Sequence, residues 1–196
     1  MRQLIVGSLA AALAMFMLGF VFYGTPVQNL GWRTATPATQ SAIQQALKAL
    51  PETGTYVIPS GETPEAMAAY AAGPIAQIQY NGGGFAMMDP VSFAGGYVQM
   101  AVSVFLVGCV LRTAVVSVFA TRARLVLGIA ATAVVYLHFA GPVWYHTDWR
   151  NALYVAVADF VILGTGGLIL ARWFVAPSVE QPEQTHGVVE RGAASA

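Results

Sequence analysis

The stretches LVLGIAATAVVYLHFAGPVW, residues 125 to 144, and LYVAVADFVILGTGGLILARW, residues 153 to 173, decide the fold class. A helix needs about 20 mainly apolar residues to cross the hydrocarbon layer of a membrane, which is about 30 Å thick. Both stretches meet that length, and the short segment YHTDWR, residues 145 to 150, joins them. We therefore predict two antiparallel membrane-spanning helices that form a tight hairpin.

Two further apolar stretches predict two more spans. The first runs from Leu4 to Tyr23 without any charge. It is longer than the roughly 7 to 15 residues of a signal-peptide core, and no small-x-small cleavage pattern follows it, so we interpret it as an uncleaved anchor. The second begins near Phe93 and ends at Leu111 or near Ala120. The predicted domains are an N-terminal transmembrane anchor (1–23), an insert (24–92), a three-helix transmembrane region (93–174) and a tail (175–196).

The overall composition excludes several other classes of protein. Hydrophobic residues make up 57% of the chain and charged residues 9%, with a mean hydropathy of +0.62. A soluble domain carries about 25% charged residues, and a disordered chain needs low hydrophobicity. Nine basic residues balance nine acidic ones without a basic cluster, so we expect no nucleic-acid partner. The single cysteine, Cys109, excludes a disulfide framework.

The positions of arginine and lysine predict the orientation in the membrane, because these residues accumulate on the cytoplasmic side. With the N-terminus inside, Arg33, Lys48 and Arg150 lie outside. The larger set lies inside and comprises Arg2, Arg112, Arg122, Arg124 and Arg172. We therefore predict a multi-pass protein of the bacterial inner (cytoplasmic) membrane with both termini in the cytoplasm. The tail is rich in Pro, Glu, Gln, Ser and Gly, and we expect it to be disordered.

The insert is expected to fold as a small α+β domain on the extracytoplasmic side. Thr36-Pro37 and Thr63-Pro64 are typical helix starts, and they predict a helix over residues 37–50 and another that stops before Gly73. Residues 54–59 predict a strand, and residues 76–80 and 85–88 predict a hairpin. Such a small domain is marginal alone, so we expect it to pack on the helix ends or on a partner. The predicted fold class is a mainly α membrane protein with four transmembrane helices and this domain between helices 1 and 2.

Ionisable residues inside spanning helices are costly, and they are the best candidates for a site. His138 and Asp159 each lie six residues inside the outer end of their helix, which is about 9 Å at the helical rise. If their faces meet, they form a buried pair, and Tyr136 and Tyr154 are candidate additional partners. This pair is interpreted either as a proton relay or ligand site, or as interhelical polar glue.

Other candidate sites are weaker. Arg112 is expected to reach inner-leaflet headgroups or a partner subunit. Small residues in the spans, among them Gly164 to Gly167, favour close helix packing, and the alternative for this glycine run is a pliable gating segment. His146 and Asp148 lack an evident third metal ligand, so we predict no metal site and no cofactor.

Three functions remain open from the sequence. The preferred one is a non-enzymatic accessory or assembly component of a larger membrane complex, because the insert is marginal and no catalytic motif is found. Its expected partners are membrane lipids and either a membrane protein or further copies of the chain. The first alternative is a small transporter or proton-coupled protein that uses His138 and Asp159. The second is a membrane enzyme acting on lipid or quinone.

Overall fold

The computed structural model describes residues 1–114 and 116–175, and the protein is mostly helical. Four helical segments are long and apolar enough to cross a membrane, which confirms the four predicted spans of a multi-pass membrane protein. Nearly all of the predicted disordered tail, 175–196, lies outside the described residues. The spans are α1 (Arg2–Tyr23), α4 (Pro90–Thr113), α5 (Phe119–His138) with α6 (Ala140–Tyr145), and α7 (Trp149–Ile169) with the π-helical η2 (Leu170–Phe174).

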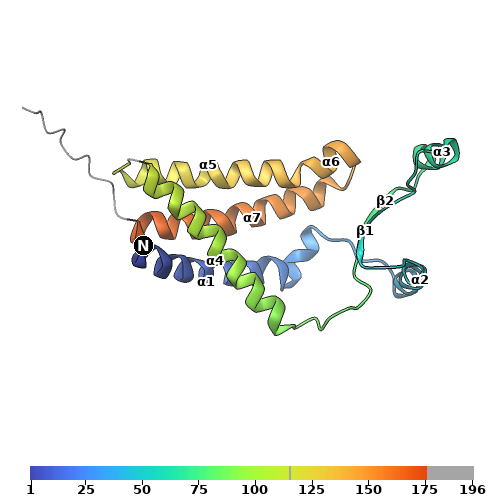
Figure 1. The fold of residues 1–196 in the computed structure, drawn as a ribbon, viewed down its shortest axis with the longest axis horizontal. Helices are drawn as coiled ribbons and strands as arrows, with labels where there is room; N and C mark the ends of the chain where they lie inside the picture. The colour runs from blue at the N-terminus through green and yellow to red at the C-terminus, as the bar shows by residue number, and fades with distance from the viewer. Residues whose placement is uncertain (115, 176–196) are drawn as a thin grey trace, which may run out of the picture. The chain divides into compact units, whose positions relative to one another are not determined.

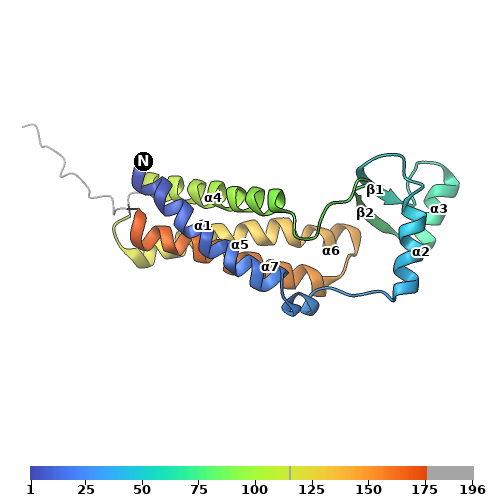
Figure 2. The same cartoon turned by 90° about the horizontal axis from the view of Figure 1, so that it is seen from below.

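The chain divides into two compact units. Among the described residues, the helical unit comprises Met1–Gly31, 94–114 and 116–175, and the insert unit comprises Trp32–Phe93. Within the helical unit, α7 lies between α1 and α5 and packs against both, as Figures 1 and 2 show. Helix α7 therefore joins α1 to α5. The hydrophobic core of the helical unit includes Leu4, Met15, Val104, Val107, Leu111, Val126, Ile162 and Leu170.

Glycines set the close approach of these helices. A methyl group at Gly166 would overlap Met15 of α1, and one at Gly167 would overlap Val126 of α5. Gly7 of α1 faces Phe174 of η2 in the same way. Small residues at such contacts allow backbones to approach closely, which is a main source of helix association in membranes. The glycine run near residue 166 therefore packs between helices, as the sequence favoured.

The ends of the spans differ in detail from the sequence expectation. The second span begins at Pro90 and ends at Thr113, which settles its open inner end. Asp89 accepts hydrogen bonds from the amide and the hydroxyl of Ser92, at 2.8 and 2.6 Å, and so satisfies donors at the start of α4. The third span bends at Phe139, between α5 and α6, and helical hydrogen bonds from Phe139 to Val135 and from Val143 to Phe139 continue across the bend.

A short 3-10 helix, η1 (Pro26–Leu30), follows α1 and is fixed to the start of α7. The guanidinium of Arg150 donates to the carbonyl oxygens of Leu30 and Asn29, each over 2.6 Å. Gly31 is buried against the ring of Tyr154, where a side chain would not fit. Arg150 therefore joins the end of the first span to the start of the last one.

The insert unit contains α2 (Pro37–Leu47), β1 (Gly54–Ile58), α3 (Pro64–Ala72) and β2 (Ala76–Tyr80). The predicted hairpin is wrong: residues 85–88 form no strand, and β2 pairs antiparallel with β1, with Gly54 opposite Tyr80. The residues between the two predicted hairpin strands, 81–84, contact the start of β1 instead. The amide of Gly82 donates a hydrogen bond to the hydroxyl of Thr53, directly before β1. Tyr56 and Tyr80 add an edge-to-face ring contact at 6.3 Å.

The insert unit has no buried core. Between Trp32 and Phe93, every side chain is exposed or only half-buried. Large apolar side chains are exposed on it, including Ile43, Met67, Ile75, Phe85, Met87 and Met88. Since burial of apolar surface is the main force that offsets chain entropy, this unit lacks the means to be stable alone.

Candidate functional site

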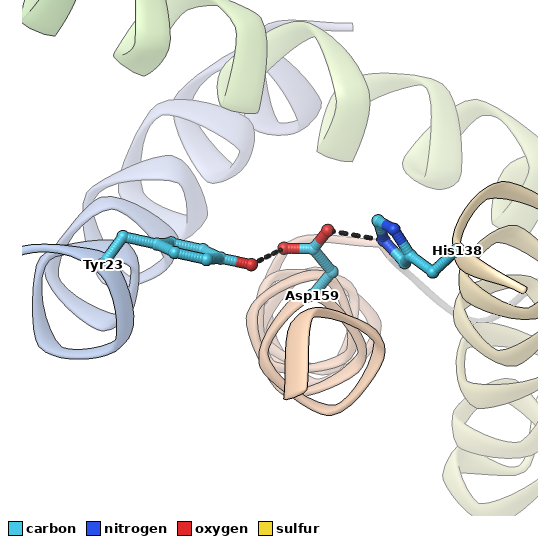
Figure 3. A network of polar contacts seen from close by, with 3 residues as sticks. All are labelled: Tyr23, His138 and Asp159. Carbon is cyan, nitrogen blue, oxygen red and sulfur yellow. Dashed lines mark hydrogen bonds and ion pairs between the residues drawn. The ribbon is translucent and has the colours of Figure 1, made fainter. Parts of the chain in front are cut away.

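Three helices of the helical unit bring one ionisable or hydroxyl side chain each to a common point. Asp159 lies on the central helix α7, His138 is the last residue of α5, and Tyr23 is the last residue of α1. Figure 3 shows the carboxylate of Asp159 between the other two side chains. We call these three residues the Tyr–Asp–His network.

Both oxygens of the Asp159 carboxylate have a partner. The hydroxyl of Tyr23 donates to Oδ1 over 2.7 Å, and Nε2 of His138 lies 2.8 Å from Oδ2. These distances are typical of strong hydrogen bonds. Counting residues from the outer end of each helix predicted that His138 and Asp159 lie at the same depth. The structure brings them into direct contact.

The protein leaves part of this network uncovered. Protein atoms leave 39% of the Asp159 side chain and 21% of the His138 side chain accessible. An ionised group inside a membrane span normally faces the bundle interior or a water-filled space, because exposure to hydrocarbon is costly. In a membrane, the uncovered part of Asp159 therefore favours contact with water or a polar group over contact with lipid tails.

Tyr154 belongs to the surroundings of the network rather than to it. Its hydroxyl donates to the carbonyl oxygen of Phe22 over 2.6 Å. Its ring makes edge-to-face contacts with Phe22 and Tyr23, with centroids 6.4 and 6.5 Å apart. Tyr154 therefore holds the last turn of α1 against α7, which positions the Tyr23 hydroxyl for Asp159.

The other two candidates from the sequence lie elsewhere. Tyr136 is 80% exposed, because a residue two positions before His138 lies on another face of α5. Arg112 is exposed at the end of α4, where its Nη1 lies 3.4 Å from Sδ of Met1. The structure thus leaves Tyr136 out of the network, and contact of Arg112 with lipid or a partner stays a prediction.

The sequence interpretation missed Tyr23. It used this residue only to mark the end of the first span. A hydroxyl at the end of the first span, on the same side as the loop between the third and fourth spans, was the available signal. It was not used because nothing in the sequence shows which face of α1 meets α7.

The arrangement can hold a proton in two ways. With the proton on His138, an imidazolium faces a carboxylate; with the proton on Oδ2 of Asp159, a carboxylic acid donates to a neutral imidazole. The Tyr23 hydroxyl donates to Oδ1 in both states. Moving the proton between His138 and Asp159 therefore keeps the three hydrogen-bonding groups in place.

Metal binding at the network has no support within residues 1–114 and 116–175. No group of three or more His, Cys, Asp or Glu side chains in this part of the chain is arranged to hold a metal ion.

Comparisons with protein-family models, curated proteins and solved structures found no match. The geometry of the described residues is therefore the basis for a function.

Proposed function

We propose that this protein is a small proton-coupled membrane protein, and that a proton enters and leaves it at the Tyr–Asp–His network. The observation that carries the proposal is a carboxylate within a membrane span that accepts two hydrogen bonds from two other helices and is still 39% uncovered. Intramembrane Asp and His residues are the usual parts of proton relays.

Polar glue is the competing explanation for the same contacts. A hydrogen bond between membrane helices contributes about 0.6 kcal/mol on average, and neutral side chains provide it as well as charged ones. A purely structural hydrogen bond between helices also does not require that solvent reach the polar groups. The ionisable pair and its uncovered carboxylate are therefore better explained by proton exchange.

The proposed topology places the network near the outer face of a bacterial inner membrane. In this topology five arginines near the span ends would lie on the side of the N-terminus, and Arg33, Lys48 and Arg150 would lie on the other side. Both termini would then be cytoplasmic and the insert unit extracytoplasmic. In this orientation the network takes protons from outside the cell membrane.

Infrared titration of the purified protein in lipid tests the proposal directly. All nine Asp and Glu residues contribute carboxylic-acid bands at low pH, so the band of Asp159 is identified as the component that wild-type protein gains as the pH falls and that Asp159→Asn lacks. Proteoliposomes with an entrapped pH dye provide the functional measurement, in which the pH gradient should decay faster with wild-type protein than with the variant.

Asp89→Asn is the matched control, because Asp89 is an acidic residue outside the network. It should leave the gradient decay unchanged. A titration in which Asp159→Asn matches wild type, with no difference in gradient decay, would reject the proposal in favour of glue.

A second candidate function is the accessory role, and the insert unit favours it. A unit without a buried side chain needs another surface, either the helix ends or a partner protein. Extraction of the tagged protein in a lipid-preserving polymer, followed by quantitative mass spectrometry, tests this role. One stoichiometric membrane-protein partner supports it, and recovery of the protein alone contradicts it.

A further inference from the structure

The end of the helical unit away from the network contains a buried arginine. Arg122, in the first turn of α5, is only 4% exposed. Its Nη1 donates to the carbonyl oxygen of Val175 over 2.5 Å, but its Nε is buried and has no hydrogen-bond partner within the described part of the chain. A buried guanidinium with an unused donor is unfavourable unless an acceptor completes its hydrogen bonds.

A cavity of about 440 Å³ lies beside Arg122. Its wall includes a second arginine, Arg172 of η2, whose guanidinium carbon lies 5.7 Å from the centre of the Phe119 ring. Gln3 and Ser117 add neutral polar groups to the wall, and its described lining residues include no Asp or Glu. The two positive charges therefore share a space that no carboxylate of this lining neutralises.

The chemistry of this cavity selects a phosphate group. A guanidinium presents donors in a planar fork that matches phosphate oxygens, and it stays protonated at every physiological pH. The unused Nε of Arg122 is one such donor, and the polar lining provides others. A carboxylate or a single-atom anion would leave more of these donors without an acceptor.

The location of the cavity favours a lipid as the source of the phosphate. The cavity is formed by the first residues of α1 and α5 and the last residues of η2, where these spans end. Trp173 lies in its wall, and tryptophan is enriched at the level of the headgroups. We propose that Arg122 and Arg172 bind the phosphate of an anionic phospholipid headgroup in this cavity.

Native mass spectrometry of the full-length protein in detergent, with added phosphatidylglycerol or phosphatidylcholine, tests this proposal. Phosphatidylglycerol should bind wild-type protein at least roughly tenfold more tightly than phosphatidylcholine, because choline would add a positive charge beside two arginines. Arg122→Gln and Arg172→Gln should each weaken phosphatidylglycerol binding by roughly tenfold, as expected for the loss of a charged hydrogen bond.

Arg124→Gln is the matched control. It removes the same charge from an exposed position on α5, two residues from Arg122, and Arg124 does not line the cavity. Binding should remain at the wild-type level in this variant. If Arg124→Gln loses as much affinity as Arg122→Gln, general charge attraction explains the binding and the site is rejected.

Two further arms complete the experiment. Inorganic phosphate that displaces the lipid, or that binds alone, would identify free phosphate as the source while keeping the phosphate site. Arg172 is exposed, so Arg172→Gln decides the question if Arg122→Gln fails to fold. Equal binding of the two lipids by wild-type protein, or unchanged phosphatidylglycerol binding by Arg172→Gln, would overturn the proposal.

Discussion

Replacement of Asp159 separates its structural role from its proton-binding role. In Asp159→Asn, the amide oxygen can accept from Tyr23 and the amide nitrogen can donate to Nε2 of His138 in its other tautomer. Both contacts survive as neutral hydrogen bonds. In Asp159→Ala, both are lost and two partly buried groups are left without their partner.

The expected magnitudes differ accordingly. A hydrogen bond to a charged group contributes about 1.5–3 kcal/mol to stability, and a neutral hydrogen bond contributes about 0.5–1.5 kcal/mol. Replacing two charged hydrogen bonds by two neutral ones would therefore cost about 2 kcal/mol. Because 39% of the Asp159 side chain is uncovered, solvent screening reduces the expected loss of unfolding free energy to about 1 kcal/mol for Asp159→Asn. Asp159→Ala should lose about 2–4 kcal/mol, because removal of the acceptor leaves its partners unsatisfied.

Unfolding in detergent can be followed with a thiol-reactive dye, because Cys109 is the sole cysteine and is half-buried. The expected result is a small stability loss for Asp159→Asn together with complete loss of the carboxylic-acid band assigned to Asp159. If Asp159→Asn is destabilised as strongly as Asp159→Ala, the charge is needed for folding itself. The separation of the two roles would then be refuted.

Three further predictions address packing, capping and the loop after α1. Gly7→Ala should lower the unfolding free energy by about 1–3 kcal/mol, because the added methyl overlaps Phe174, whereas Gly128→Ala, with nothing within 4 Å, should leave the dye-monitored unfolding unchanged. The hydrogen bonds from Ser92 lower the pKa of Asp89, so the protection of the Ser92 amide should persist below the ordinary Asp pKa and disappear as the pH falls through the lowered value. Hydrogen exchange at Ser92 checks this, and Asp89→Ala should remove the protection at every pH. Arg150→Ala should increase hydrogen exchange and proteolysis around η1, since two of its hydrogen bonds to that segment are lost; unchanged exchange there would contradict the role of Arg150.

The transmembrane part was predictable because a single physical requirement dominates it. Membrane-spanning helices need length and apolar composition, and both are visible in the printed sequence. The depth of His138 and Asp159 followed from the fixed rise of a helix and their shared loop. Tyr23 could not be placed in this way, because its contact depends on the rotation of α1 about its own axis.

The insert was predicted less well for a related reason. The helix starts at Thr36 and Thr63 are local signals, and both helices begin at the following proline. Strand pairing is not local: residues 76–80 had two candidate partners, and the sequence favoured the nearer one across a glycine-rich turn. The contact of Tyr56 with Tyr80 and the bond from Gly82 to Thr53 favour the more distant strand.

The packing of α7 indicates where motion would accompany the proposed proton exchange. A pliable glycine run would have placed a gate between Asp159 and Arg172. However, Gly166 packs tightly against Met15, and Gly167 packs tightly against Val126. Helix α7 therefore acts as a fixed support at that level. A bend at Phe139 directly follows His138, between α5 and α6. In the proposed proton exchange, a change in the charge of His138 would act next to this bend, so α6 is the element that we expect to move.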